Sequence, residues 1–298
     1  MSPATLCDGL WGGIGMSPRS APTARQRRLG AELRRMREHA GMSVAAAGEE
    51  LGTDRTRISN MEAGRLGMSE ERIRALAAIY QCGDQPYVDA LAAMATERVN
   101  GWWEEYRGTL HAGVLDLAEL EHHAVGLRWL QSMHMPGLLQ TEAYAKAVFS
   151  TAVPALTTLE LRRVLSHRLR RRDVLDRDVP PHCTFLIHEA ALRMEFGGPK
   201  VLRDQLEYVL EASFREHVTV RAIPFAAGGF PGAGSSTLYA TGPVPQLDTV
   251  ELDVATGVTL IDAETLLSNY RLIMDRAEER SLTPEDTREF IHTIAQQL

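Results

Sequence analysis

The chain has 298 residues, of which 44% are hydrophobic and 24% charged, so it is long enough for two domains with substantial cores. Its formal net charge of −7 argues against nucleic-acid binding by the whole surface, and no apolar run approaches the roughly 20 residues that cross a membrane. The charge is unevenly divided, however. Residues 19–82 carry twelve arginines against eight acidic residues, whereas residues 83–298 carry twenty basic and thirty acidic residues. A basic module joined to an acidic body indicates that one part contacts phosphate and the other has a different task.

The beginning of the chain and the cysteines indicate a cellular compartment. Residues 1–23 have neither the positive start nor the apolar run of a signal peptide, and we expect them to be a disordered tail. Cys7, Cys82 and Cys183 lie far apart without a CxxC pair. They therefore predict neither a disulfide framework nor a cysteine zinc site, and they fit a reducing cytoplasm.

The segment 43–64 has the pattern of a helix, a tight turn and a second helix. Ser43 is a candidate N-cap for the first helix, and Asp54 is a candidate N-cap for the second. Gly52 offers the positive φ that ends a helix. Gly48 falls in the middle of the first helix, where glycine costs roughly 1 kcal/mol relative to alanine. Its presence predicts a close approach of the second helix.

The second helix of this pair, residues 54–62, has one apolar and one polar side. Ile58 and Met61 are spaced to face the core. The outer side carries arginine, threonine, serine and asparagine, which suit base edges and phosphates in a major groove. The alternative is an ordinary helical hairpin whose polar side is only solvated.

Apolar residues recur at helical spacing both before and after this pair of predicted helices. Three further amphipathic helices are predicted, one before the pair and two after it, which gives a five-helix domain over residues 24–98. Their apolar residues are Leu29, Leu33, Met36 and Ala40; Ile73, Leu76, Ala77 and Tyr80; and Val88, Leu91, Ala92 and Ala95.

The stretch from about Arg28 to Tyr80 resembles the Cro/cI-type (xenobiotic-response-element) helix-turn-helix family. The resemblance rests on LGAELRRMREHAGMS (29–43) and LGTDRTRISNMEAGR (51–65). It implies base contacts by Arg55, Thr56 and Asn60, and a partly buried ion pair between Arg37 and Glu62.

Two residues depart from the pattern of that family. Val44 stands where the family usually has glutamine, and Asp54 stands where it often has a hydroxyl residue near phosphate. A carboxylate close to phosphate is repulsive unless it is engaged in capping.

The second part of the chain, residues 99–298, begins with helical patterns. Leu117, Leu120, Ala124 and Leu127 recur at helical spacing, which predicts a helix that ends before Pro136. Further on, Thr141 is expected to cap a helix, and Thr157 with Glu160 forms a capping box. That capping box opens a second arginine cluster, LRRVLSHRLRRRDVLDRD (161–178). We favour a solvated face paired with Asp173, Asp176 and Asp178 over a second DNA contact.

Past residue 180 the pattern changes to short β-rich runs. A strand at 183–188, a helix at 199–214 and a strand at 218–223 form a candidate βαβ unit. The runs 236–241, 248–254 and 257–261 predict further strands, the last two joined by a turn at 255–257. Helices at 262–280 and 284–298 close the chain, the second capped by Thr283 before Pro284. The fold class is therefore mainly α plus α+β: a five-helix domain followed by a larger α+β domain with a helical front half.

From about Gly101 onward the chain resembles a domain of unknown function that follows helix-turn-helix modules in actinomycete developmental regulators, the WhiJ-like, antitoxin-like group. The resemblance rests on WWEEYRGTL (102–110), MPGLLQTEAYAKAV (135–148) and the arrangement of residues 185–193 and 218–225. It implies a small partner protein encoded nearby.

The sequence predicts no enzyme, metal or cofactor. His182 and His188 would share a face of one strand nearly 20 Å apart, too far for joint ligation. The adjacent His122 and His123 would point in different directions on a helix. The glycine-rich segment 226–236 lacks GxxxxGK and leads into a strand, so it is predicted to be a loop, with a possible role as a lid over an effector site.

Two functions remain. The first is a cytoplasmic, nucleoid-associated transcriptional regulator that binds double-stranded DNA as a homodimer, with helix 54–62 in the major groove and the second domain for dimerisation and partner or ligand binding. The alternative is an antitoxin-like interaction protein whose main activity is complex formation, with autoregulatory DNA binding. The residues predicted to contact DNA are Ser43, Val44, Arg55, Thr56, Arg57, Ser59, Asn60 and Arg65.

Overall fold

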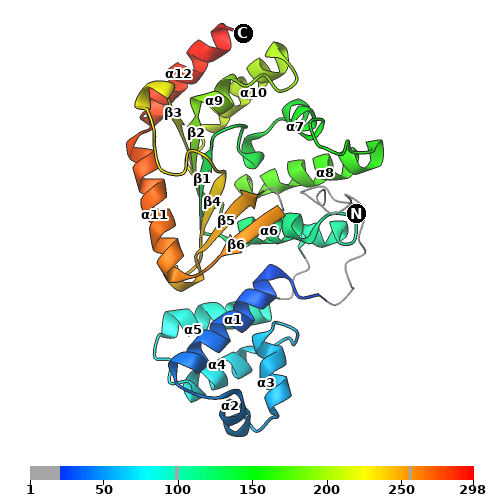
Figure 1. Cartoon of the computed structure of the whole chain (residues 1–298), viewed down its shortest axis with the longest axis vertical. Helices are drawn as coiled ribbons and strands as arrows, with labels where there is room; N and C mark the ends of the chain where they lie inside the picture. The colour runs from blue at the N-terminus through cyan, green and yellow to red at the C-terminus, as the bar shows by residue number, and fades with distance from the viewer. Residues whose placement is uncertain (1–20, 98–100, 255–256) are drawn as a thin grey trace, which may run out of the picture. The chain divides into compact units, whose positions relative to one another are not determined.

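The computed structural model of the chain describes residues 21–97, 101–254 and 257–298 (Figure 1). The chain divides into two compact units, one with the described residues up to Glu105 and the other from Tyr106 to Leu298. The predicted tail, residues 1–23, lies outside the described residues except at its end, where Thr23 already caps the first helix. In the described ranges, no helix is both long and apolar enough to cross a membrane.

The first unit is helical, as the sequence predicts. Each of its helices begins after a side chain that accepts a hydrogen bond from an amide of the first turn, namely Thr23, Ser43, Asp54, Ser69 and Asp84. The helices are α1 (Ala24–His39), α2 (Val44–Glu50), α3 (Arg55–Glu62), α4 (Glu70–Ile79) and α5 (Gln85–Thr96), followed by the 3-10 turn η1 (Trp102–Tyr106).

The second unit is built on a six-stranded mixed sheet with the order β3-β2-β1-β4-β5-β6. β1, β2 and β3 are parallel, whereas β4, β5 and β6 are antiparallel to their neighbours (Figure 1). The strands are β1 (Gly126–Gln131), β2 (His182–His188), β3 (Val218–Ile223), β4 (Thr237–Thr241), β5 (Thr249–Val254) and β6 (Gly257–Ile261).

Helices cover both faces of this sheet. The α-helices are α6 (Ala112–His123), α7 (Glu142–Phe149), α8 (Thr158–Arg171), α9 (Glu189–Arg193), α10 (Pro199–Ala212), α11 (Glu264–Glu279) and α12 (Pro284–Gln296). Short 3-10 turns are η2 (Gly137–Leu139), η3 (Arg172–Leu175), η4 (Phe225–Ala227) and η5 (Pro245–Leu247). Together the two units confirm the predicted fold class.

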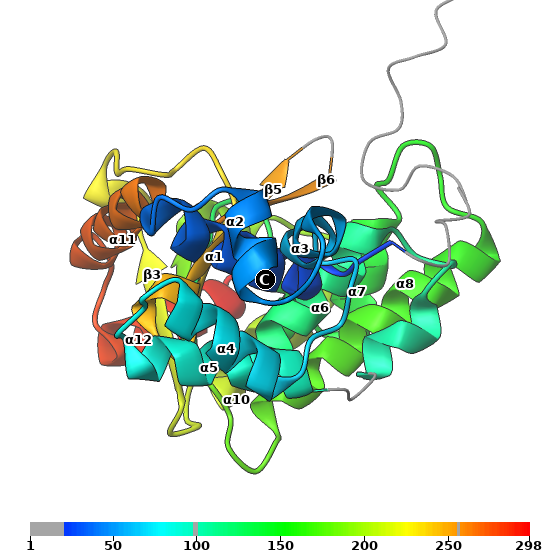
Figure 2. The ribbon, with the colours of Figure 1, turned by 90° about the horizontal axis from the view of Figure 1, so that it is seen from below.

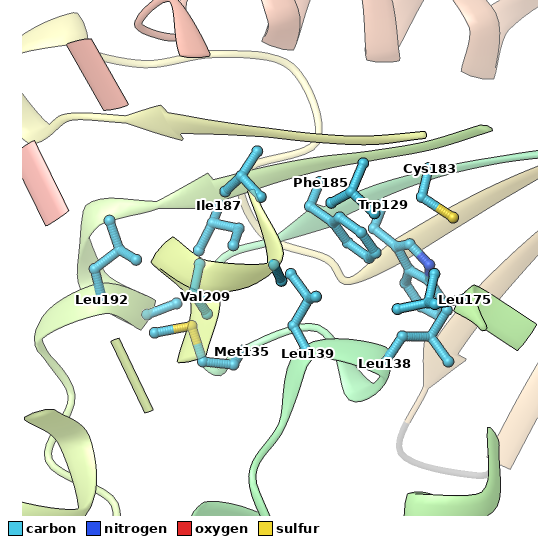
Figure 3. Close-up of a cluster of buried hydrophobic side chains, with 14 of the residues drawn as sticks. Trp129, Met135, Leu138, Leu139, Leu175, Cys183, Phe185, Ile187, Leu192 and Val209 are labelled. Carbon is cyan, nitrogen blue, oxygen red and sulfur yellow. The ribbon is translucent and has the colours of Figure 1, made fainter. Parts of the chain in front are cut away.

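Alternating side chains of the sheet build two separate cores. On one face, Trp129 and Phe185 pack against residues of α6, η2, α7 and α10. Figure 3 shows these two rings pointing from the strands towards Leu138. On the other face, Leu130 and Leu186 pack against α11.

The strands and the βαβ unit past residue 180 were predicted correctly. α10 connects the parallel strands β2 and β3, and the register pairs Cys183 with Val218. β5 and β6 pair as predicted, and residues 255–256 of the expected turn between them lie outside the described residues.

The predicted helix around Leu117–Leu127 was wrong in its second half. α6 ends at His123, and the next residues form β1, which lies between β2 and β4 in the sheet. Leu127 and Leu130 are fully buried on opposite faces. A short apolar run fits a buried strand and a buried helix equally well, and here the sheet decides between them.

The arginine cluster at 161–178 was also predicted incorrectly. Arg171 does not lie on a solvated face. It is buried and forms a bidentate ion pair with Glu121 of α6, with distances of 2.8 and 2.6 Å. Asp176 pairs with Arg215 at 2.8 Å. Because Arg171 follows Val164 by seven residues, two helical turns, it lies on the buried side of α8.

Candidate nucleic-acid interface

The connection between α2 and α3 is a tight turn that depends on glycine. Gly52 has a φ of +66°, the left-handed conformation that glycine adopts without strain. A Cβ atom on Gly48 would lie 2.8 Å from the carbonyl oxygen of Thr53. The approach predicted from Gly48 is therefore present. The Asp54 carboxylate accepts a hydrogen bond from the Arg57 amide at 2.8 Å, so it is engaged in capping α3.

The inner side of α3 is fixed against the rest of the unit. Ile58 is 1% exposed and Met61 2% exposed. α3 packs against α1 and α2, which Figure 2 shows beside it. A Cβ atom on Gly30 of α1 would lie only 2.4 Å from the carbonyl oxygen of Glu62. With this side packed so closely, the opposite side of α3 is held outward.

An ion pair attaches the end of α3 to α1. The Arg37 Nε and Nη2 atoms donate to the two carboxylate oxygens of Glu62 at 2.6 and 3.0 Å. Both side chains are 8% exposed. Arg37 also donates to the carbonyl oxygen of Met42 at 2.7 Å. The expected pair is thus present, and the hydrogen bond to Glu62 raises the pKa of Arg37.

A second buried polar group, which the sequence did not reveal, joins α1 to α5. The Tyr87 hydroxyl donates to the Glu32 carboxylate at 2.6 Å, and Arg28 and Arg35 pair with the same carboxylate. Burial is the main cause of the raised pKa of Tyr87. The contact joins residues 55 positions apart, so no local pattern indicates it.

The predicted contact residues lie on the outer side of the unit. Arg55, Thr56, Arg57 and Ser59 are exposed, and Asn60 is partly exposed. In the flanking segments, Ser43 and Arg65 are exposed and Val44 is partly exposed. The structure therefore leaves the predicted surface open within its own unit.

The arginines of this surface differ from other arginines of the same unit. In the described part of the chain, Arg55, Arg57 and Arg65 form no ion pair with a carboxylate. Six other arginines of the unit pair with carboxylates: Arg25 with Glu97, Arg28 and Arg35 with Glu32, Arg34 with Glu38, Arg37 with Glu62, and Arg74 with Glu70 and Asp89. Three arginines without an ion pair in the described chain thus lie on α3 and in the loop that follows it.

One further arginine of the described unit also lacks an ion pair. Arg72 in the first turn of α4 is partly exposed and, among the described residues, forms no ion pair. The sequence contained a weak signal for it, because it follows the loop that carries Arg65 by only seven residues.

The structure shows where the histidines that were considered for metal binding lie and what they contact. Nδ1 of His188 accepts a hydrogen bond from the amide of Ala190 at 3.3 Å and so caps α9. His182 is exposed at the opposite end of β2. His122 and His123 are adjacent with their ring planes at 87°.

Comparison with protein families agrees with this geometry. Residues 28–91 match the family described as a helix-turn-helix domain. The first unit is therefore a helix-turn-helix domain, and the protein is a DNA-binding regulator of that class. Residues 114–293, more than half of the chain, match the domain of unknown function DUF5753. The chain belongs to the DUF5753 family. Comparison with curated proteins and with solved structures found no significant match.

Proposed function

We propose that the protein is a sequence-specific transcriptional regulator that places α3 in the major groove of double-stranded DNA. One observation carries the proposal: α3 and the loop after it present exposed guanidinium groups that no carboxylate of the described chain neutralises. Arginine without an internal partner is suited to phosphate oxygens and to the O6 and N7 acceptors of guanine.

The residues of this surface have different tasks. Arg55, Thr56 and Asn60 contact base edges, a role that the resemblance to Cro/cI-type domains supports. Arg65 and the start of α2 at Ser43 and Val44 contact phosphates and set the position of α3. Arg57 and Ser59 extend the same polar side.

A single recognition helix reads few base pairs, which favours a dimer. We propose a homodimer that binds an inverted repeat with half-sites about 34–36 Å apart. The acidic composition of the second unit supports a role away from the phosphates, in dimerisation and in the binding of an effector or partner.

The experiment selects binding sites from a random DNA pool with the full-length protein and then measures variants on the selected site. We expect Arg55→Ala and Asn60→Ala each to lose about 1–3 kcal/mol of specific binding and to relax the preference at one base position. Arg74→Ala is the matched control, because this arginine is paired with Glu70 and Asp89. Unchanged affinity and preference in both test variants would refute the proposal.

A further inference from the structure

The two edges of the six-stranded sheet differ in how they are covered. At the β3 edge, the carbonyl oxygen of Ala222 accepts a hydrogen bond from the amide of Leu282 at 2.8 Å. The amide of Ala222 donates to the hydroxyl of Thr287 at 3.0 Å. Thr287 belongs to α12, which packs against β3. The outer side of β3 is therefore occupied by α12 and by the segment that leads into it.

The opposite edge, formed by β6, is open. β6 pairs with β5 on its inner side, and Figure 1 shows it as the last strand of the sheet. In an antiparallel ladder, every second residue turns its amide and carbonyl groups away from the neighbouring strand. Within the described ranges, residues 257–261 make no hydrogen bond beyond the ladder with β5. The outward backbone groups of β6 are thus available to a further strand.

β6 also differs from the open edge strands that proteins protect against pairing. Protected edge strands carry charged side chains, proline or a bulge. The sequence of β6 is GVTLI, which has neither a charge nor a proline, and its five residues pair one to one with β5. A strand of this kind pairs readily with another strand, so its position at an edge indicates a partner.

The side chains of β6 alternate between the two faces of the sheet. Val258 lies on the face covered by α6, because a Cβ atom on Gly113 of that helix would lie 3.1 Å from its Cβ atom. Leu260, two residues on, lies on the same face. Both side chains are partly exposed, and Thr259 between them is exposed. Apolar groups therefore remain open to solvent along the edge although α6 covers the face beside them.

We propose that β6 pairs with β6 of a second copy of the chain, antiparallel and across a two-fold axis at Thr259. The two six-stranded sheets then join into one continuous sheet. The proposal rests on the homodimer proposed above and names the surface through which it forms.

The strand is complementary to itself in this register. The axis places Thr259 opposite its own copy, Val258 opposite Leu260, and Gly257 opposite Ile261. Directly opposed β-branched and aliphatic side chains stabilise an antiparallel pair, and this register brings no like charges together. The axis stands perpendicular to the sheet, so the faces covered by α6 in the two copies lie on the same side.

The symmetry of this contact favours a second copy over a strand of another protein. A patch that pairs with itself across a two-fold axis closes at two copies and leaves no edge of β6 open. A strand from a different partner would require no self-complementary sequence. A two-fold dimer also matches the inverted repeat that the proposed reading of DNA requires.

The test measures the dimer dissociation constant of the full-length protein by analytical ultracentrifugation without DNA. Thr259→Lys and Thr259→Glu each place two like charges opposite one another, and each should raise the dissociation constant about tenfold or more. An equimolar mixture of the two variants should restore an affinity near that of the parent, because lysine then lies opposite glutamate. This rescue is specific to a register in which residue 259 meets its own copy.

The control is Thr219→Lys at a partly exposed position of β3, the covered edge. It should leave the dissociation constant unchanged, and circular dichroism verifies that each variant is folded. A monomeric parent protein, a dissociation constant that neither charge variant changes, or a mixture that fails to restore the dimer overturns the proposal. Because DNA is absent, the result is independent of whether α3 binds DNA.

Discussion

Two arginine-bearing helices of this protein use the same side chain in opposite ways. α3 exposes Arg55 and Arg57 without an acidic partner, whereas α8 buries Arg171 against Glu121. The difference follows from spacing. The arginines of α3 lie off the side that Ile58 and Met61 bury. The comparison shows that the position of an arginine relative to the apolar side of its helix decides whether it is buried in an ion pair or exposed.

The largest expected effect on the free energy of unfolding is that of replacing the buried arginine of α8. Arg171→Ala leaves the Glu121 carboxylate buried without its partner, and we expect a loss of about 3–5 kcal/mol in the free energy of unfolding. Arg55→Ala should change it by less than about 0.5 kcal/mol, because that side chain is exposed and unpaired. Urea unfolding measures both, with Arg162→Ala as the control on α8. Equal effects in the three variants would contradict the contrast.

A pH titration sharpens the comparison, because the buried side of α8 also carries His167. Desolvation, with Arg171 and Arg168 nearby, lowers the pKa of His167 to about 3 in the folded protein, against about 6.5 when unfolded. The unfolded chain therefore binds the proton first, and stability falls as the pH drops below about 6.5. Between pH 7 and pH 5 we expect a loss of about 2 kcal/mol that is missing in His167→Gln.

The measurement is urea unfolding at the two pH values. His182→Gln is the control, because this histidine is exposed in the same unit. The control variant should keep the pH dependence of the parent protein. A pH dependence that persists unchanged in His167→Gln would show that another group causes it.

A smaller effect is expected at the turn that presents α3. Gly48→Ala places a Cβ atom 2.8 Å from the Thr53 carbonyl oxygen, which forces the backbone to shift and should cost about 1–3 kcal/mol. Gly67→Ala is the matched control, because a Cβ atom there meets nothing within 4 Å. Thermal unfolding compares the two. A stability of Gly48→Ala at or above that of the parent would show that the turn relaxes without strain.

The helix-turn-helix domain was predictable because its determinants are local. Ser43, Asp54 and Gly52 mark helix ends within a few residues of the amides and turns that they serve. The alternation of buried and exposed positions in α3 follows from Ile58 and Met61 in the same way.

The second unit was less predictable because its determinants are distant in sequence. β1 is a strand because β2 and β4 pair with it, and these begin 56 and 111 residues after it. The Arg171–Glu121 pair joins residues 50 positions apart. The spacing of Arg171 from Val164 did place it on the buried side of α8, and this signal was available.

The most direct test of the central claim is the salt dependence of DNA binding. We expect affinity of the full-length protein for its selected site to fall steeply with added salt, and Arg65→Ala to reduce the slope of log K against log salt by about one. Combined replacement of Arg55, Arg57 and Arg65 by alanine should abolish specific binding, while Arg162→Ala in the second unit should leave slope and affinity unchanged. Specific binding with an unaltered slope in the triple variant would contradict the assignment of α3 and its loop as the DNA-contacting surface.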